Sequence, residues 1–204
     1  DPGEFIFPTD VYPDPDGQSV WVTDYGRRNR VMQFTREGEF IKEWGPELYT
    51  NVDLDRPMAI ALPENGEKIY VVDAGNHRLN VYNREGELVD QFGEAGNAPG
   101  QLKYPYDLSF GPDGLLYIVE YGNNRVSRYT PQWEYKGSWG RAGSGAGLFA
   151  SPWGCTIGPG GALIVADTNN QRLQIVREPD SYFRVDKPQV SAGNGNTSRE
   201  NSGG

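Results

Sequence analysis

The chain has 204 residues, of which 36% are hydrophobic and 12% aromatic, and its formal net charge is −9 at pH 7. This apolar content is enough to bury a sizeable core, and no stretch approaches the roughly 18 to 20 consecutive apolar residues of a membrane-spanning helix. The negative charge disfavours nucleic acid as a partner, because phosphate contacts need clustered lysine and arginine side chains.

A pattern of residues occurs four times along the sequence. Each unit contains an apolar run, an acidic residue, a polar turn and an arginine. These acidic and basic residues are Asp24 and Arg30, Asp73 and Arg78, Glu120 and Arg125, and Asp167 and Arg172. The four arginines are 48, 47 and 47 residues apart, so the period is steady. A repeat of about 40 to 50 residues is typical of a β-propeller blade.

In chain order, each unit begins with a proline, which is Pro8, Pro57, Pro105 or Pro152. In the third unit a strand is predicted over residues 106–110, followed by a Gly-Pro-Asp-Gly turn. Further strands are predicted over 116–119, over 125–129, and over a fourth stretch that ends at Trp139. The second of these is nearly all apolar, as expected for a strand covered on both faces.

We therefore predict an all-β chain with four four-stranded antiparallel blades, at about residues 5–45, 55–93, 103–140 and 150–187. The fourth unit lacks the aromatic-glycine ending of the others, and residues 181–185 are expected to form its outermost strand. A closed ring and an open arc both fit the sequence, and an arc would leave two apolar blade faces in water. Residues 188–204 form a polar tail rich in Gly, Asn and Ser, which is expected to be disordered unless a partner orders it.

The runs Asp73–Leu79 and Asp167–Leu173, DAGNHRL and DTNNQRL, resemble the NHL repeat. The resemblance covers about residues 3–187. Two units depart from the pattern, since Glu120 replaces the usual aspartate and one extra residue separates Asp24 from Arg30. The resemblance implies a propeller, most often of six blades, that is used mainly to bind other molecules. A few members of the family are enzymes, and some bind RNA.

Candidates for chemistry are few. His77 is the only histidine and lies in the signature turn, which favours a structural role; the similar peptide-amidating lyase needs several histidines for zinc. Cys155 is the only cysteine and is expected to be a buried thiol in the first strand of blade four. We therefore predict no catalytic residue, no cofactor and no metal site. The repeated acidic and arginine residues are expected to tie the second and third strands of each blade together.

The acidity is concentrated early in the chain, because the residues up to Glu67 contain 14 acidic and 6 basic side chains. Solvated turns explain this distribution, and so does a surface for a basic protein partner. The leading hypothesis is a non-enzymatic protein-binding scaffold or accessory subunit of a larger complex, including one at a membrane. Its contacts with other subunits are expected on the first blade, the open face of the fourth blade and the tail after Val190.

The alternative is an enzyme like the gluconolactonase and strictosidine-synthase propellers, with a carboxylate-lined central site. It requires Asp10, Asp107 and Asn51 to converge at one mouth of the channel. The first residues, Pro2–Phe5, match residues 99–102, so the chain starts within an inter-blade loop. This leaves room upstream for a signal peptide, an anchor or an earlier segment. The compartment stays open, with the periplasm or extracellular space slightly favoured.

Overall fold

The computed structural model describes residues 3–45 and 53–185, which form fifteen strands and three short 3₁₀ helices. Blade 1 consists of β1 (Phe7–Pro13), β2 (Ser19–Tyr25), β3 (Arg30–Thr35) and β4 (Phe40–Trp44). Blade 2 consists of β5 (Pro57–Ala61), β6 (Ile69–Asp73), β7 (Arg78–Tyr82) and β8 (Leu88–Phe92). Blade 3 consists of β9 (Pro105–Phe110), β10 (Leu116–Glu120), β11 (Arg125–Tyr129) and β12 (Tyr135–Trp139). Blade 4 consists of β13 (Gly154–Ile157), β14 (Leu163–Asp167) and β15 (Arg172–Val176), with η1 (Pro159–Gly161), η2 (Thr168–Asn170) and η3 (Pro179–Ser181).

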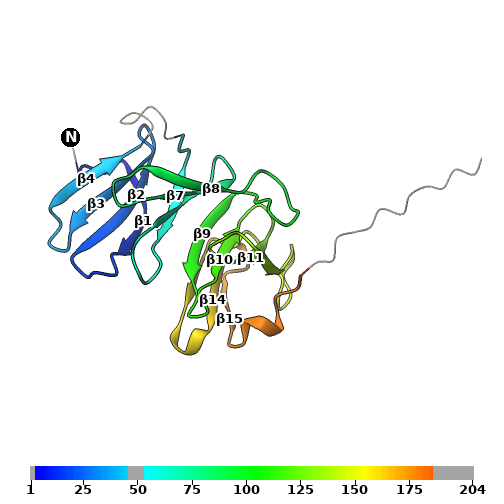
Figure 1. The fold of residues 1–204 in the computed structure, drawn as a ribbon. Coiled ribbons are helices and arrows are strands. Elements are labelled where there is room, and N and C mark those ends of the chain that lie inside the picture. The colour runs from blue at the N-terminus through cyan, green and yellow to red at the C-terminus, as the bar shows by residue number, and fades with distance from the viewer. Residues whose placement is uncertain (1–2, 46–52, 186–204) are drawn as a thin grey trace, which may run out of the picture.

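All paired strands within the blades are antiparallel and follow chain order, so the predicted propeller fold is confirmed. The innermost strands β1, β5, β9 and β13 pack against one another in sequence. Blade 1 (blue) and blade 4 (yellow to orange) lie at opposite ends of this row (Figure 1). The described part of the chain is therefore an open arc of blades.

Each blade is apolar on both faces, and neighbouring blades bury these faces against each other. We call the face toward the preceding blade the N-side face and the face toward the following blade the C-side face. On β6, Ile69 and Val71 pack in a core with blade 1, whereas Tyr70 and Val72 pack in a core with blade 3. Alternation along one strand thus serves two cores, which explains the continuous apolar run in the sequence.

The repeated carboxylate lies at the end of the second strand of each blade. Asp73 accepts hydrogen bonds from the Asp55 amide at 2.7 Å, the Asn76 side chain and Arg78 Nε at 2.8 Å. Arg78 Nη2 in turn donates to the carbonyl oxygen of Asp53 at 2.6 Å. The pair thus ties β6, β7 and the loop that enters the blade into one unit.

The other three blades repeat this network. The arginine Nε donates to the carboxylate at 3.0 Å in blade 1, 2.6 Å in blade 3 and 2.8 Å in blade 4. The carboxylates also accept backbone amides of the preceding loop, from Ile6, Lys103 and Ala150. All four carboxylates are buried, so each needs these donors to offset the loss of hydration.

The end of blade 4 differs from the sequence-based expectation. In the described residues its sheet has three strands, and residues 181–185 do not form its outermost strand. Arg184 instead forms an antiparallel bridge with Ser138 of β12, on the outer edge of blade 3. Phe183 is buried between the two blades, against Tyr117 and beneath the guanidinium of Arg128. Burial of this ring therefore directs the segment away from β15. The predicted tail lies outside the described residues.

The carboxylate network predicts a large effect for Asp73→Ala. The substitution leaves the Asp55 amide, Asn76 and Arg78 without their acceptor, and we expect the free energy of unfolding to fall by about 2 to 4 kcal/mol in urea titrations. Asp53→Ala is the matched control, since Asp53 pairs with the same arginine but is exposed, and should cost less than about 1 kcal/mol. Equal losses in the two variants would contradict a structural role for the buried carboxylate.

Candidate functional site

Two carboxylates lie along the inner strands, at the centre of the arc. Asp10 on β1 accepts the Ile60 amide of β5 at 3.0 Å, and Asp107 on β9 accepts the Cys155 amide of β13 at 2.7 Å. Each aspartate therefore bridges its own blade to the inner strand of the next one.

Burial changes the acid-base properties of these two groups. Burial raises the pKa of Asp10, although hydrogen bonds from the Ile60 and Val11 amides act in the opposite direction. Burial, with a further contribution from the charge of Asp10, raises the pKa of Asp107 to about 7. Burial and the neighbouring Asp107 carboxylate also raise the pKa of the Cys155 thiol well above its ordinary value. The inner strands therefore hold a carboxyl group that exchanges its proton near neutral pH.

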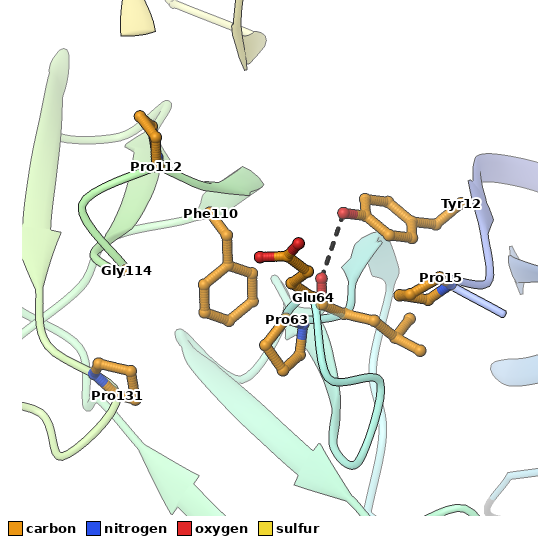
Figure 2. Close-up of a pocket in the computed structure, with 10 residues that line it drawn as sticks. Tyr12, Pro15, Pro63, Glu64, Phe110, Pro112, Gly114 and Pro131 are labelled. Atoms are coloured by element: carbon orange, nitrogen blue, oxygen red, sulfur yellow. Dashed lines mark hydrogen bonds between the residues drawn. The ribbon is translucent and has the colours of Figure 1, made fainter.

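A cavity of about 540 Å³ opens beside the turns that leave the inner strands of blades 1 to 3. Figure 2 shows Pro63 and Glu64 between the rings of Tyr12 and Phe110. The Tyr12 hydroxyl donates to the carbonyl oxygen of Leu62 at 3.2 Å. The ring of Phe110 packs edge-on against Tyr70, with the centroids 5.1 Å apart. These two contacts fix the orientations of the Tyr12 and Phe110 rings, which border the cavity.

Prolines and an acidic side chain complete the lining of this cavity. Its four prolines are Pro15, Pro63, Pro112 and Pro131. Because a proline ring fixes φ, these turns lose little conformational freedom when they bind another molecule. Glu64 is exposed in the same turn as Pro63, so the cavity combines rigid apolar walls with a negative charge.

Aromatic side chains gather at the opposite ends of the inner strands. Tyr106 and Tyr121 are stacked with centroids 4.7 Å apart, and Trp153 meets Tyr106 edge-on at 5.1 Å. Trp153 is half-exposed. This aromatic rim spans blades 3 and 4 and offers a second apolar surface around the centre of the arc.

His77 joins two blades. Its Nδ1 accepts the Tyr104 amide at 2.9 Å, which links the turn of blade 2 to the loop that enters blade 3. Asn124 occupies the same repeat position in blade 3, and its Oδ1 accepts the Ser151 amide at 2.8 Å. His77 and Asn124 both have positive φ, at 58° and 52°, so their turns point the side chains toward the following blade. We call these two contacts the inter-blade latches.

Comparisons with known proteins agree with this geometry. The NHL repeat matches residues 149–176, which include β13, β14 and β15. The chain is a β-propeller that contains an NHL repeat in blade 4. A catalytically inactive virginiamycin B lyase from Staphylococcus aureus superposes on 92% of this chain with a TM-score of 0.65 and 18% identity, and 58% of the lyase is covered. Hydrazine synthase from Kuenenia stuttgartiensis superposes on 80% of this chain with a TM-score of 0.59 and 19% identity, and 42% of that chain is covered. At these identities the likeness shows the fold alone.

Relatives at higher identity align with only part of this propeller. Peptidyl-glycine alpha-amidating monooxygenase A from Xenopus laevis is 35% identical over 119 residues, which is 55% of this chain and 12% of the relative. The Rattus norvegicus enzyme is 29% identical over 86 residues, which is 40% of this chain and 9% of the relative. The propeller thus spans a small fraction of these relatives' length.

The structure brings together only some of the residues singled out from the sequence. The four acidic and arginine pairs stay in separate blades and do not converge on one site. Asp10 and Asp107 are close enough for the charge of one to act on the other, whereas Asn51 lies outside the described residues. Cys155 is partly buried and packs against the core between blades 3 and 4. Among the described residues, no group of three or more His, Cys, Asp and Glu side chains is arranged to hold a metal ion.

The cavity and the aromatic rim were not predicted from the sequence. A signal for the cavity exists, because Pro15, Pro63, Pro112 and Pro159 recur in the turns after the first strand of every unit. The rim carries a weaker signal. Tyr106 and Trp153 both follow the first proline of their units, where the other two units have Thr9 and Met58. Tyr121 follows the repeated carboxylate, as Tyr25 does, whereas Ala74 and Thr168 stand there in the other units.

The raised pKa of Asp107 predicts a pH-dependent gain for Asp107→Asn. In the folded state Asp107 keeps its proton up to about pH 7, whereas in the unfolded chain it loses the proton above the ordinary pKa of 3.8. The contribution of Asp107 to the stability of the folded state is therefore full below pH 3.8 and is lost as the pH rises to about 7. Asparagine stays neutral and keeps an oxygen for the Cys155 amide. We expect the melting temperature of the variant, relative to the original protein, to rise between pH 5 and 8, by the equivalent of roughly 2 kcal/mol.

The control for this experiment is Glu85→Gln, which neutralises an exposed carboxylate in the turn after β7. Its melting temperature relative to the original protein should stay nearly constant over the same pH range. A constant difference for Asp107→Asn as well would show that the carboxyl group titrates in the same way in the folded and unfolded states.

Proposed function

We propose that this propeller is a non-enzymatic protein-binding module, and that it binds a basic, partly apolar segment of another protein subunit in the cavity beside Tyr12 and Phe110. The observation that carries the proposal is the combination of rigid aromatic and proline walls with an exposed acidic side chain in one concave surface of about 540 Å³. Concave apolar surfaces with a few fixed polar groups are the usual form of a binding site.

The charge distribution of the chain supports a basic partner. Glu64 borders the cavity, and Asp16 is exposed in the turn that contains Pro15. Both belong to the first third of the chain, in which acidic side chains outnumber basic ones by 14 to 6 up to Glu67. Acidic groups beside an apolar cavity increase the association rate of a basic partner and select against acidic ones.

The second candidate is a propeller enzyme with a central carboxylate site. A specific observation favours it, because Asp107 has a pKa of about 7 and lies within electrostatic reach of Asp10, an arrangement suited to general acid-base chemistry. Against it, both carboxylates already accept backbone amides that join neighbouring blades. Metal analysis of the purified protein separates the two candidates at low cost, since stoichiometric metal after dialysis would favour the enzyme.

Charge reversal at the cavity tests the binding proposal. Proteins that bind the immobilised chain in an extract of its source are identified, and the dissociation constant of the purified partner is then measured by calorimetry. Glu64→Lys should weaken binding about tenfold or more, which corresponds to about 1.4 kcal/mol, and the loss should shrink at high salt because screening weakens exposed charges.

The matched control is Glu37→Lys, which reverses an exposed acidic side chain in the turn between β3 and β4, outside the cavity lining. It should leave the dissociation constant nearly unchanged. Equal weakening by both variants would indicate a diffuse effect of net charge, and an unchanged affinity for Glu64→Lys would rule out the cavity as the binding site.

A further inference from the structure

We propose that a cavity between blades 2 and 3 binds the oxyanion group, a carboxylate or a phosphate, of a small molecule, with His77 and Lys103 as hydrogen-bond donors. The cavity has a volume of about 340 Å³ and lies at the joint where the C-side face of blade 2 meets the N-side face of blade 3. We call it the joint cavity. It shares no lining residue with the cavity beside Tyr12 and Phe110, so the two sites can be tested separately.

The hydrogen bond of the inter-blade latch fixes the tautomer of His77. Its Nδ1 accepts the Tyr104 amide at 2.9 Å, so the proton of the neutral ring is on Nε2. The Tyr104 ring meets the imidazole edge-on with the centroids 4.3 Å apart, which holds the imidazole in one orientation. Nε2 has no hydrogen-bond partner among the described residues. His77 therefore has one oriented N–H donor to offer to a ligand in the joint cavity that it lines.

Lys103 brings a positive charge to the joint cavity. Its side chain is exposed and forms no ion pair with another residue of the described ranges. Its stem lies against Gly122, where an added Cβ would be 2.6 Å from Lys103 Cγ. None of the described residues that line the joint cavity is acidic, although the chain has a net charge of −9. An oxyanion therefore finds both a cation and an N–H donor here, without a carboxylate to repel it.

The far wall of the joint cavity is a loop that side chains of blade 3 hold in place. Asn123 donates to the carbonyl oxygen of Gly96 at 2.8 Å, and Arg125 donates to that of Gln101 at 3.1 Å. A wall fixed in this way loses little conformational entropy when a ligand binds. The Tyr104 ring is 36% exposed and offers an apolar surface for the organic part of the ligand.

The joint between blades 3 and 4 shows which of these contacts the fold repeats. Its loop, residues 141–151, has the same length as residues 94–104. Asn170 donates to the carbonyl oxygen of Gly143 at 2.9 Å, and Arg172 donates to that of Leu148 at 2.9 Å. The asparagine and the arginine thus hold the loop at both joints.

The two proposed donors are absent from that second joint. Asn124 stands at the repeat position of His77, and Ala150 stands at that of Lys103. Asn124 still forms the latch, because its Oδ1 accepts the Ser151 amide at 2.8 Å. Neither an imidazole nor a lysine is therefore needed to build the joint, and His77 and Lys103 give the joint cavity a chemistry of its own.

Titrating the full chain with phenyl phosphate, benzoate and benzamide tests the proposal, with backbone amide shifts followed by NMR. Phenyl phosphate and benzoate carry an oxyanion on a ring that can lie against Tyr104, and benzamide is a neutral analogue. We expect saturable shifts of the Gly96, Asn97 and Tyr104 amides with at least one of the two anions, and none with benzamide. The relative affinities of the two anions identify which oxyanion the joint cavity prefers.

Variants copied from the second joint remove the donors while keeping the loop and the latch. Lys103→Ala should raise the dissociation constant of the anion about tenfold, because a charged donor is lost. His77→Asn should raise it about threefold or more, because the Nε2–H donor is lost while the new amide oxygen accepts the Tyr104 amide. Melting temperatures should stay close to that of the original protein. Lys68→Ala removes an exposed positive charge before β6, outside the joint cavity, and should leave the dissociation constant nearly unchanged.

Three results would overturn the proposal. The first is the absence of saturable shifts with both anions at millimolar concentration. The second is equal binding of benzamide, which would show that the ring alone is recognised. The third is equal weakening by Lys103→Ala and Lys68→Ala, which would indicate a diffuse effect of net charge. Loss of affinity in Lys103→Ala and His77→Asn alone, at unchanged melting temperature, would support the site.

Discussion

The burial of blade faces is the constraint on which this structure depends. Each blade is a sheet with strands of four to seven residues that is apolar on both sides, so a single blade would expose about as much apolar surface as it buries. Stacking solves the problem only for faces that have a neighbour. Three such interfaces lie within the arc, and they account for most of the buried aliphatic and aromatic side chains. At the two ends of the arc, some side chains at the same repeat positions are exposed, such as Val11 of blade 1 and Leu173 of blade 4, whereas Val22 and Phe34 stay buried within blade 1.

Polar contacts set the spacing and register that these faces need. The buried carboxylate of each blade holds the second strand, the third strand and the incoming loop together, while the latches fix one blade to the next. Between blades 1 and 2, Arg84 pairs with Asp14, which also accepts Trp21 Nε1 at 2.8 Å. Burial alone would raise the pKa of Asp14, but the hydrogen bonds from Arg84 and Trp21 outweigh it and lower the pKa. Directional contacts thus specify an arrangement that apolar packing alone leaves loose.

The fold was predictable because its determinants are local and repeated. A carboxylate followed five or six residues later by an arginine marks the turn between two strands, and four copies fix four blades. The path after Val176 was not predictable, because it depends on Phe183 finding a space between Tyr117 and Arg128, two residues more than 50 positions earlier. The cavity also depends on contacts between residues far apart in the sequence. Asp10 and Asp107 were candidates from their residue type, but the cavity is formed by turns from three blades, and its walls come together only in the assembled arc.

The distribution of tryptophans has an optical consequence. Trp21 and Trp44 lie in the joint between blades 1 and 2, Trp133 stacks on Phe92 at the joint between blades 2 and 3, and Trp139 packs against Phe149 between blades 3 and 4. The fifth, Trp153, stands half-exposed on the aromatic rim. Every joint therefore contains its own intrinsic fluorophore in a distinct environment. Chains that retain a single tryptophan would report separately on the opening of each joint, which makes the propeller suited to resolving whether its blades separate together or one at a time.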